Sequence, residues 1–287
     1  MADIPRLNGI IRALEEGRPA FTCFSGIDVN AAANIAASKY DGVVFEMEHQ
    51  PYDIVGFRHA LQYMLNRRQL VTGGTLAPAV TPLVRIPVNG IEKAQWPAKQ
   101  VLDSGAYGVV WPHISSVEEA YSAVSACRYP RMKDRPDYHP AGLRGDGPHG
   151  AVRYWGLTQQ EYYDRADVWP LNPKGEIFVI LQMEDIAGIE ALDDILTKVK
   201  GVGAILIGEG DLSQELGYPR QYEHPEVLKW MKKVVDTCKK HNVPVGHPHV
   251  EAGNAERIIK EGYTFLMCAP AQGFGHLTKA REFAGLK

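Results

Sequence analysis

Short apolar runs alternate with longer amphipathic stretches along most of this chain. Runs of this length that are rich in valine, isoleucine, leucine and phenylalanine are typical of buried strands. They predict eight strands, at residues 21–24, 42–45, 82–85, 108–111, 177–181, 203–207, 243–246 and 264–268. The amphipathic stretches predict a leading helix and one helix after each strand, at residues 6–16, 29–38, 54–65, 91–104, 116–127, between 184 and 203, 225–241, 251–261 and 277–283.

Eight strand–helix units in 287 residues predict an α/β fold, a (β/α)8 TIM barrel that spans residues 1–287 as one domain. An open doubly wound sheet is the alternative, but no GxGxxG motif follows the first strand. A long insertion at 130–175 interrupts the pattern after the fourth unit. Its aromatic side chains suggest a lid over the site, a contact with a neighbouring subunit, or a small core of its own; they are Tyr154, Trp155, Tyr162, Tyr163 and Trp169.

Composition narrows the class of protein. The chain has 31 basic and 34 acidic residues, so no basic excess favours nucleic acid. No apolar run approaches the roughly 20 residues of a membrane span, and the first residues lack the pattern of a signal peptide. The four cysteines are scattered without a CxxC motif. We therefore expect free thiols and a cytoplasmic protein.

Ionisable residues end most of the predicted strands. In a parallel barrel these ends meet at one mouth, where such enzymes place their chemistry. A single histidine or arginine at such a position is more often structural, but a series of them on one rim predicts an active site. The series comprises Glu46, Glu48, His49, Arg85, His113, Glu184, Asp211, His247 and His249.

The fifth and sixth strands end in Glu184 and Asp211, at a spacing that suits one β-α-β crossover. Two neighbouring carboxylates repel each other unless a cation or a proton lies between them. A hard divalent cation such as Mg²⁺ fits, because it takes one or two carboxylates and leaves positions for water and substrate oxygens. The alternative interpretation is that both acids only cap helices.

The same rim suggests chemistry at a carbon–carbon bond next to a 2-keto acid. A cation can polarise the keto oxygen, and Arg85 can donate a fork of hydrogen bonds to the developing enolate. A histidine supplies proton transfer, and the helix opening at Gly208–Gly210 offers N–H groups to the substrate carboxylate. No lysine ends a strand, which argues against a Schiff-base aldolase.

Several motifs carry a resemblance to a known family. The chain resembles the HpcH/HpaI family of metal-dependent (class II) pyruvate aldolases over roughly residues 20 to 270. The matching pieces, in family order, are Glu46-x-Glu48-His49-x-Pro51, Val84-Arg85-Ile86-Pro87, Leu102-Asp103-x-Gly105-Ala106, Arg128-Tyr129-Pro130, Gly142-Leu143-Arg144-Gly145, Gln182-Met183-Glu184 and Gly208-x-Gly210-Asp211-Leu212-Ser213.

The resemblance implies a lyase that cleaves or forms the bond between a pyruvate enolate and an aldehyde, in 4-hydroxy-2-oxo acids, and that also decarboxylates oxaloacetate. It implies a homo-oligomer, a trimer or a hexamer with a swapped C-terminal helix, and Mg²⁺, Mn²⁺ or Co²⁺ bound by Glu184 and Asp211. Arg85, Gln182, Gly210 and Asp211 would contact the keto acid. His49 would transfer protons with Asp103 orienting it, and His113 would contact the acceptor.

The chain also departs from the family pattern. Glu46 stands where the family often has aspartate, and Gly208-Glu209-Gly210-Asp211 replaces Gly-Pro-Ala-Asp, which puts the Glu209 carboxylate near the mouth. His113 is similar in position to a substrate-contacting histidine of macrophomate synthase, a member that decarboxylates oxaloacetate and joins the enolate to a 2-pyrone. A macrophomate-synthase-like decarboxylase and C–C bond-forming enzyme is therefore an alternative. A non-catalytic barrel and a phosphosugar-binding barrel with a phosphate loop at 270–275 are two further readings.

Overall fold

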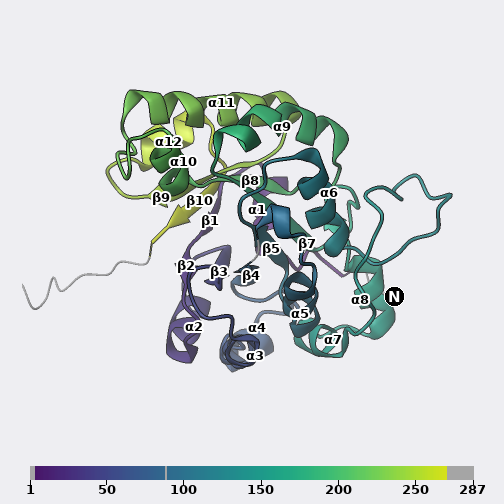
Figure 1. Cartoon of the computed structure of the whole chain (residues 1–287). Helices are drawn as coiled ribbons and strands as arrows, with labels where there is room; N and C mark the ends of the chain where they lie inside the picture. The colour runs from purple at the N-terminus through teal and green to yellow at the C-terminus, as the bar shows by residue number, and fades with distance from the viewer. Residues whose placement is uncertain (1–3, 88, 270–287) are drawn as a thin grey trace, which may run out of the picture.

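The computed structural model describes residues 4–87 and 89–269 and shows parallel strands that close into a barrel with helices outside (Figure 1). The strand order is β1-β10-β9-β8-β7-β5-β4-β3-β2, with the short β6 beside β7. The strands are β1 (Ala20–Thr22), β2 (Phe24–Ser25), β3 (Gly42–Glu46), β4 (Thr81–Arg85), β5 (Gly108–Trp111), β6 (Val168–Trp169), β7 (Ile177–Met183), β8 (Ala204–Ile207), β9 (Val245–Val250) and β10 (Phe265–Cys268).

The barrel closes because its first strand is divided at Cys23 into β1 and β2. Ala20 in β1 pairs with Phe265 in β10, and Phe24 in β2 pairs with Val44 in β3. The carbonyl of Cys23 accepts a hydrogen bond of 2.8 Å from the Val44 N–H, so pairing continues across the break. With β1 and β2 counted as one strand, and with β6 left out because it pairs only with β7, eight strands follow in chain order around the barrel. The predicted TIM barrel is confirmed.

Helices follow the strands as the amphipathic pattern predicts. They are α1 (Gly9–Glu15), α2 (Val29–Ala36), α3 (Ile54–Tyr63), α4 (Arg67–Thr72), the 3₁₀ turn η1 (Gly90–Glu92), α5 (Trp96–Ser104), α6 (Val117–Ala126), α7 (His149–Trp155), α8 (Gln159–Arg165), α9 (Ile186–Lys198), α10 (Glu209–Glu215), α11 (Pro225–His241) and α12 (Ala255–Glu261). Side-chain caps begin α2, α3, α6 and α9, where Asp28, Asp53, Ser116 and Asp185 each accept a backbone N–H. None of these helices is long and apolar enough to cross a membrane.

The helix predicted at 91–104 and the unpredicted α4 mark two differences between the predictions and the structure. The predicted helix at 91–104 is divided into η1 and α5, because Lys93 between them has a left-handed backbone with φ of 49°. The short α4 has no buried residue and therefore no apolar periodicity that would predict it. The helix predicted at 277–283 lies outside the described residues.

Alternate residues of each strand enter two separate cores. Inside the barrel, Val44, Leu83, Val110, Ile180 and Leu206 pack together with Ile10 and Ile11 of α1, which close one end. The neighbours of these strand residues face outward and pack under the helices. Each strand therefore carries apolar residues on both faces, as a parallel barrel covered by helices requires.

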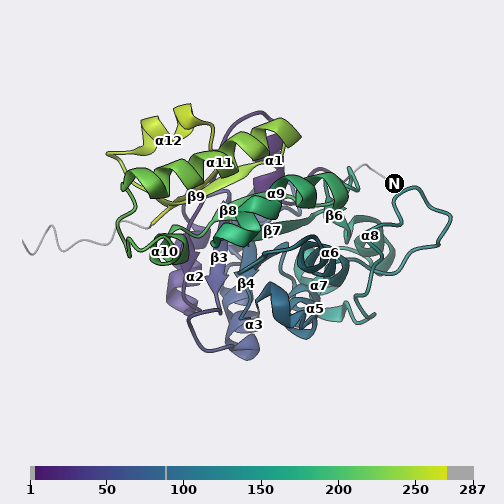
Figure 2. The ribbon, with the colours of Figure 1, turned by 45° about the horizontal axis from the view of Figure 1, so that its top comes forward.

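The 130–175 insertion packs against the side of the barrel and not over its mouth. Trp155 of α7 stacks on Tyr107 with ring centroids 4.1 Å apart and donates a 2.9 Å hydrogen bond to the Gly105 carbonyl, just before β5. The fully buried Arg128 forms an ion pair of 2.8 Å with Asp167 at the other end of the insertion. The buried aromatic residues of the insertion belong to the same core as the outer face of the barrel, and Figure 2 shows α7 and α8 beside α5 and α6. The insertion is therefore not a lid over the mouth of its own barrel.

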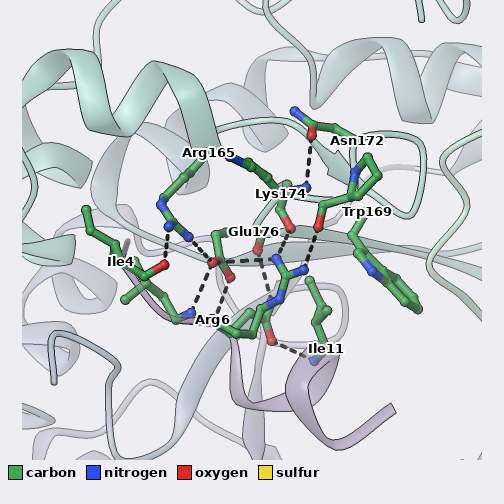
Figure 3. Close-up of polar contacts among 12 residues, drawn as sticks. Ile4, Arg6, Ile11, Arg165, Trp169, Asn172, Lys174 and Glu176 are labelled. Atoms are coloured by element: carbon green, nitrogen blue, oxygen red, sulfur yellow. Dashed lines mark hydrogen bonds and ion pairs between the residues drawn. The ribbon is translucent and has the colours of Figure 1, made fainter. Parts of the chain in front are cut away.

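A buried carboxylate fixes the N-terminal segment beneath the barrel (Figure 3). Glu176, which precedes β7 and is fully buried, accepts hydrogen bonds from the Leu7 and Asn8 N–H groups at 3.0 and 2.8 Å. Arg165 of the insertion donates a third at 3.0 Å, and Arg6 lies 3.5 Å away. Burial raises the pKa of Glu176, and the three donors together with the charge of Arg6 offset part of that effect. One side chain thus joins α1, the insertion and β7.

We expect Glu176→Gln to lower the free energy of unfolding by about 2–4 kcal/mol, because both guanidinium groups lose their buried counter-charge. Urea unfolding followed by circular dichroism measures the change. The matched control is Glu190→Gln, an exposed position on α9 that should shift the value by less than about 0.5 kcal/mol. Equal effects of the two substitutions would show that the Glu176 network does not stabilise the fold.

Candidate active site

Arg85 lies at the centre of the barrel mouth and is surrounded by polar side chains from neighbouring strands. It ends β4 opposite Glu46 of β3, and its Nε donates to Glu46 Oε2 at 2.8 Å. Its Nη1 donates to Gln182 Oε1 of β7 at 3.3 Å and lies 3.1 Å from Glu48 Oε2. The guanidinium also stacks 4.5 Å above the Phe24 ring. These contacts fix one edge of the guanidinium and leave Nη1 facing the mouth.

Three more side chains form a metal-ligand-like cluster beside Arg85. Ligand atoms of Glu48, His113 and Glu184 all lie within 4.8 Å of one another. His113 lies between the two acids, with Nε2 at 3.7 Å from Glu48 Oε1 and Nδ1 at 3.4 Å from Glu184 Oε1. Its backbone has φ of 50°, a left-handed conformation that turns the chain sharply after β5. The structure thus brings His113 into the site.

Glu184 is the most strongly perturbed acid of the mouth. Its side chain is buried beneath Gln182, and its Oε1 accepts a 2.6 Å hydrogen bond from the His113 N–H. Gly208 is required beside it, because a Cβ there would lie 2.4 Å from Glu184 Oε2. Burial raises the pKa of Glu184 to about 8, with further increases from the charges of Glu48 and Asp211.

Asp211 lies in the first turn of α10, close enough for its charge to act on Glu184. The residue that caps α9 is Asp185, and α10 begins after Gly208, so neither predicted metal ligand serves as an N-cap. This excludes the capping interpretation of both acids. Next to Asp211, a Cβ on Gly210 would meet no heavy atom of residues 4–87 and 89–269 within 4 Å, so these residues leave space above that backbone.

The donor set of the mouth fits a hard divalent cation. Carboxylate oxygens of Glu48 and Glu184 converge with a ring nitrogen of His113, and Asp211 is close enough for its charge to act on Glu184. The burial of Glu184 makes an isolated charge there costly. Among the described residues the buried Oε2 of Glu48 has no hydrogen-bond donor, although Arg85 lies close. Glu184 and Asp211 have no lysine or arginine partner among the described residues, and a bound cation would neutralise their negative charge.

His49 and Asp103 are not brought together within one chain. The His49 side chain is 65% exposed, its Nε2 is 3.6 Å from Glu48 Oε2, and its N–H donates to Glu46 Oε1 at 3.1 Å. Asp103 lies in the last turn of α5, near the start of β5 and so at the opposite end of the barrel. There its Oδ1 forms an ion pair of 2.7 Å with the buried Arg144. The orientation of His49 by Asp103 stays a prediction.

Glu209 does not point into the mouth, contrary to the expectation from its motif. Because alternate residues along this segment face opposite ways, Gly208 faces Glu184 and Glu209 faces outward. Its side chain is buried, and Oε1 is hydrogen-bonded to His249 Nδ1 of β9. That bond raises the pKa of His249. Glu209 therefore fastens α10 to β9 behind the site.

Sequence reasoning assigned no role to two acids of the mouth. Glu46 holds Arg85 by two hydrogen bonds, and Glu48 completes the cluster with His113 and Glu184. The available signal was the alternation Glu46-x-Glu48 at the end of a buried strand. Alternation places both side chains on one face, which here is the face of the mouth.

Comparisons with known proteins agree with this geometry. The profile of the HpcH/HpaI aldolase/citrate lyase family matches residues 22–271. Hydroxypyruvate/pyruvate aldolase of Roseobacter denitrificans is 29% identical over 81% of this chain and 80% of its own. 2-Keto-3-deoxy-L-rhamnonate aldolase of Klebsiella pneumoniae is 31% identical, over 82% of this chain and 76% of its own.

Solved structures of the same fold cover nearly the whole chain. An HpcH/HpaI aldolase/citrate lyase family protein from Burkholderia cenocepacia gives a TM-score of 0.74 at 24% identity, over 96% of this chain and 97% of that one. Macrophomate synthase gives 0.71 at 21% identity, over 96% and 89%. Since the family profile spans most of its length, the chain belongs to the HpcH/HpaI aldolase/citrate lyase family and is a carbon–carbon lyase.

Proposed function

We propose that the protein is a class II pyruvate aldolase, which cleaves 4-hydroxy-2-oxo acids to pyruvate and an aldehyde or joins them. The observation that carries the proposal is a guanidinium at the mouth beside a cluster of carboxylates with excess negative charge. Family membership supports the reaction class, and two relatives are named as aldolases of hydroxypyruvate, pyruvate or a 2-keto-3-deoxy sugar acid.

A divalent cation, Mg²⁺ with Mn²⁺ or Co²⁺ as alternatives, would be held by Glu184 and Asp211, with Glu48 and His113 close by. When bound, it would act as a Lewis acid toward the oxygens of the keto acid. Glu48 lies between the cation ligands and Arg85, since it belongs to the cluster with Glu184 and is 3.1 Å from Nη1 of Arg85. Its negative charge would therefore face both the cation and the guanidinium. Gln182 links the two halves of the site by bonding both Arg85 and Glu184.

Arg85 would bind the keto acid and stabilise the charge of the enolate. Glu46 holds its Nε edge, so little side-chain freedom is lost when Nη1 turns to the substrate. The open space above Gly210 gives the substrate carboxylate room beside Asp211. The planar fork suits two oxygens of one substrate better than a lysine ammonium would.

The two histidines of the mouth would divide proton transfer and acceptor binding. His49 is exposed and faces Glu48, which suits a group that exchanges protons with solvent. His113 lies between Glu48 and Glu184, closer to the cation ligands, and would donate a hydrogen bond to the acceptor carbonyl. This position of His113 also favours the second candidate function, a macrophomate-synthase-like oxaloacetate decarboxylase that captures the same enolate.

We further propose a homo-oligomer, a trimer or a hexamer, in the cytoplasm. Large apolar side chains at Val71, Ile91 and Met132 are 70% exposed or more. An Asp103 from another copy could reach His49, whereas the Asp103 of the same chain lies at the far end of the barrel. Four free cysteines suit a reducing compartment. Light scattering that gives the 31.8 kDa of one chain would contradict the oligomer.

The proposed function predicts that the protein exchanges the methyl protons of pyruvate in D₂O when Mg²⁺ is present, which NMR detects without knowledge of the aldehyde. Arg85→Lys should slow this exchange on the order of 10²-fold, because lysine cannot copy the fork that stabilises the enolate. The control is Arg58→Lys, an exposed arginine of α3. Exchange that is absent in the wild type would reject enolate formation, and a loss under about threefold in Arg85→Lys would make Arg85 structural.

Metal affinity should rise with pH up to about 8 and then level off. Below the pKa of Glu184, which is about 8, the carboxyl carries a proton that a cation must displace, so binding weakens as pH falls. Calorimetry with Mn²⁺ between pH 6 and 8.5 measures this trend. Glu184→Gln combined with Asp211→Asn should abolish both binding and EDTA-sensitive activity. The control pair is Glu190→Gln with Asp194→Asn on the exposed face of α9, and residual full activity in the first pair would reject this metal site.

Removal of the His113 ring should separate two activities. His113→Asn keeps a residue that tolerates the left-handed backbone at φ of 50°. We expect oxaloacetate decarboxylation to stay within about threefold of wild type, while aldol cleavage slows on the order of 10²-fold. Coupled spectrophotometric assays measure both rates. If decarboxylation falls as far as it does in Arg85→Ala, His113 acts on the enolate itself.

A further inference from the structure

A second cleft, of about 790 Å³, lies on the outside of the barrel between α11 and α12. Figures 1 and 2 show these helices next to each other over β9. The residues that line it do not include Arg85, Glu184 or Asp211, so it is separate from the candidate active site. Its volume falls within the range of sites for small organic ligands.

The wall formed by α11 is apolar in its deeper part. Leu228, Met231 and Val235 line the cleft from successive turns of that helix. Five basic and five acidic side chains line the cleft. Some of them form ion pairs: Arg257 with Glu223 and Glu261, and Lys232 with Asp236. Because these charges neutralise each other, the cleft favours a ligand with an apolar body and no net charge.

The floor of the cleft holds a buried polar pair. Gly246 of β9 faces inward onto Phe265 and Leu206, so the next residue, His247, faces outward into the cleft. Its side chain is 8% exposed and lies edge-on to the Tyr263 ring, 5.0 Å between centroids. Glu209, the outward-facing first residue of α10, lines the same floor.

His247 presents a hydrogen-bond donor that the described residues leave without a partner. Its Nδ1 accepts a 3.2 Å hydrogen bond from the His249 N–H, so a neutral ring carries its hydrogen on Nε2. Burial lowers the pKa of His247, which favours that neutral ring. The facing Glu209 Oε2 lies 4.0 Å from Nε2, too far for a direct hydrogen bond, while Glu209 Oε1 is bonded to His249.

A gap of 4.0 Å between a donor and an acceptor suits one hydroxyl group. A hydroxyl oxygen can accept from His247 Nε2–H and at the same time donate its hydrogen to Glu209 Oε2, at ordinary distances to both. We propose that this cleft is a second ligand site, which binds an uncharged organic molecule with an apolar body and one hydroxyl group. The hydroxyl bonds His247 and Glu209, and the apolar body packs on Met231 and Val235 of α11.

Titration with 4-ethylphenol, followed by ligand-observed NMR on the full chain, tests the proposal. The matched probe is 4-ethylanisole, whose ether oxygen can accept from His247 but cannot donate to Glu209. We expect saturable binding of the phenol and at least about tenfold weaker binding of the ether, because the ether leaves the buried carboxylate without its donor. No saturable binding of the phenol, or equal affinity for both probes, would overturn the proposal.

Variants locate the binding. His247→Phe removes Nε2–H but keeps a ring against Tyr263, and it should bring the phenol to the affinity of the ether. His59→Phe, an exposed histidine of α3, is the control and should keep the preference. Val235→Trp should fill the cleft and block both probes. Arg85→Ala should bind the phenol as well as wild type, and lost binding there would place the phenol in the barrel mouth and reject a second site.

Discussion

The guanidinium of Arg85 balances much of the charge at the barrel mouth. Because all strands of the barrel are parallel, their carboxyl ends lie at one rim. Four acids lie there: Glu46, Glu48, Glu184 and Asp211. Arg85 offsets the first two by direct contact and reaches the third only through Gln182. Among the described residues, Glu184 and Asp211 have no lysine or arginine partner, and this uneven distribution of charge favours a bound cation. The reactivity of the mouth is thus a property of the whole set of charges.

The two ends of the barrel treat a buried carboxylate in opposite ways. At the closed end, Glu176 faces two backbone donors and two guanidinium groups, so the protein itself supplies groups that counter its charge. At the open end, Glu184 receives only an amide side chain and one backbone N–H, and its pKa rises to about 8. The first arrangement stabilises the fold. The second arrangement leaves the Glu184 carboxylate poorly compensated, so a cation that binds there gains free energy, as is typical of functional sites.

Much of this arrangement could be predicted from the sequence. Apolar runs of four or five residues predicted the strands. The polar residues at the end of these runs, or within four positions after it, identified Arg85, His113, Glu184 and Asp211 as members of one rim. The break at Cys23, the left-handed turn at Lys93 and the direction of Glu209 were not predictable in the same way. Each depends on contacts between segments far apart in the chain, and hydrophobic periodicity reports only on neighbours. The separation of Asp103 from His49 could not be predicted for the same reason. A motif gives the position of a residue in the sequence, but it does not tell which end of a helix lies at the mouth.

The attachment of the 130–175 segment bears on how members of this family can be recombined. Trp155 completes the packing around Tyr107 at the foot of β5, and Asp167 neutralises an arginine that is wholly inside the protein. In a chimera that has a short loop in place of this segment, the Tyr107 ring would be exposed. Arg128 would remain buried without its carboxylate partner. The segment is therefore a structural partner of the barrel, and a transplant of it would have to include Tyr107 and Arg128 as well.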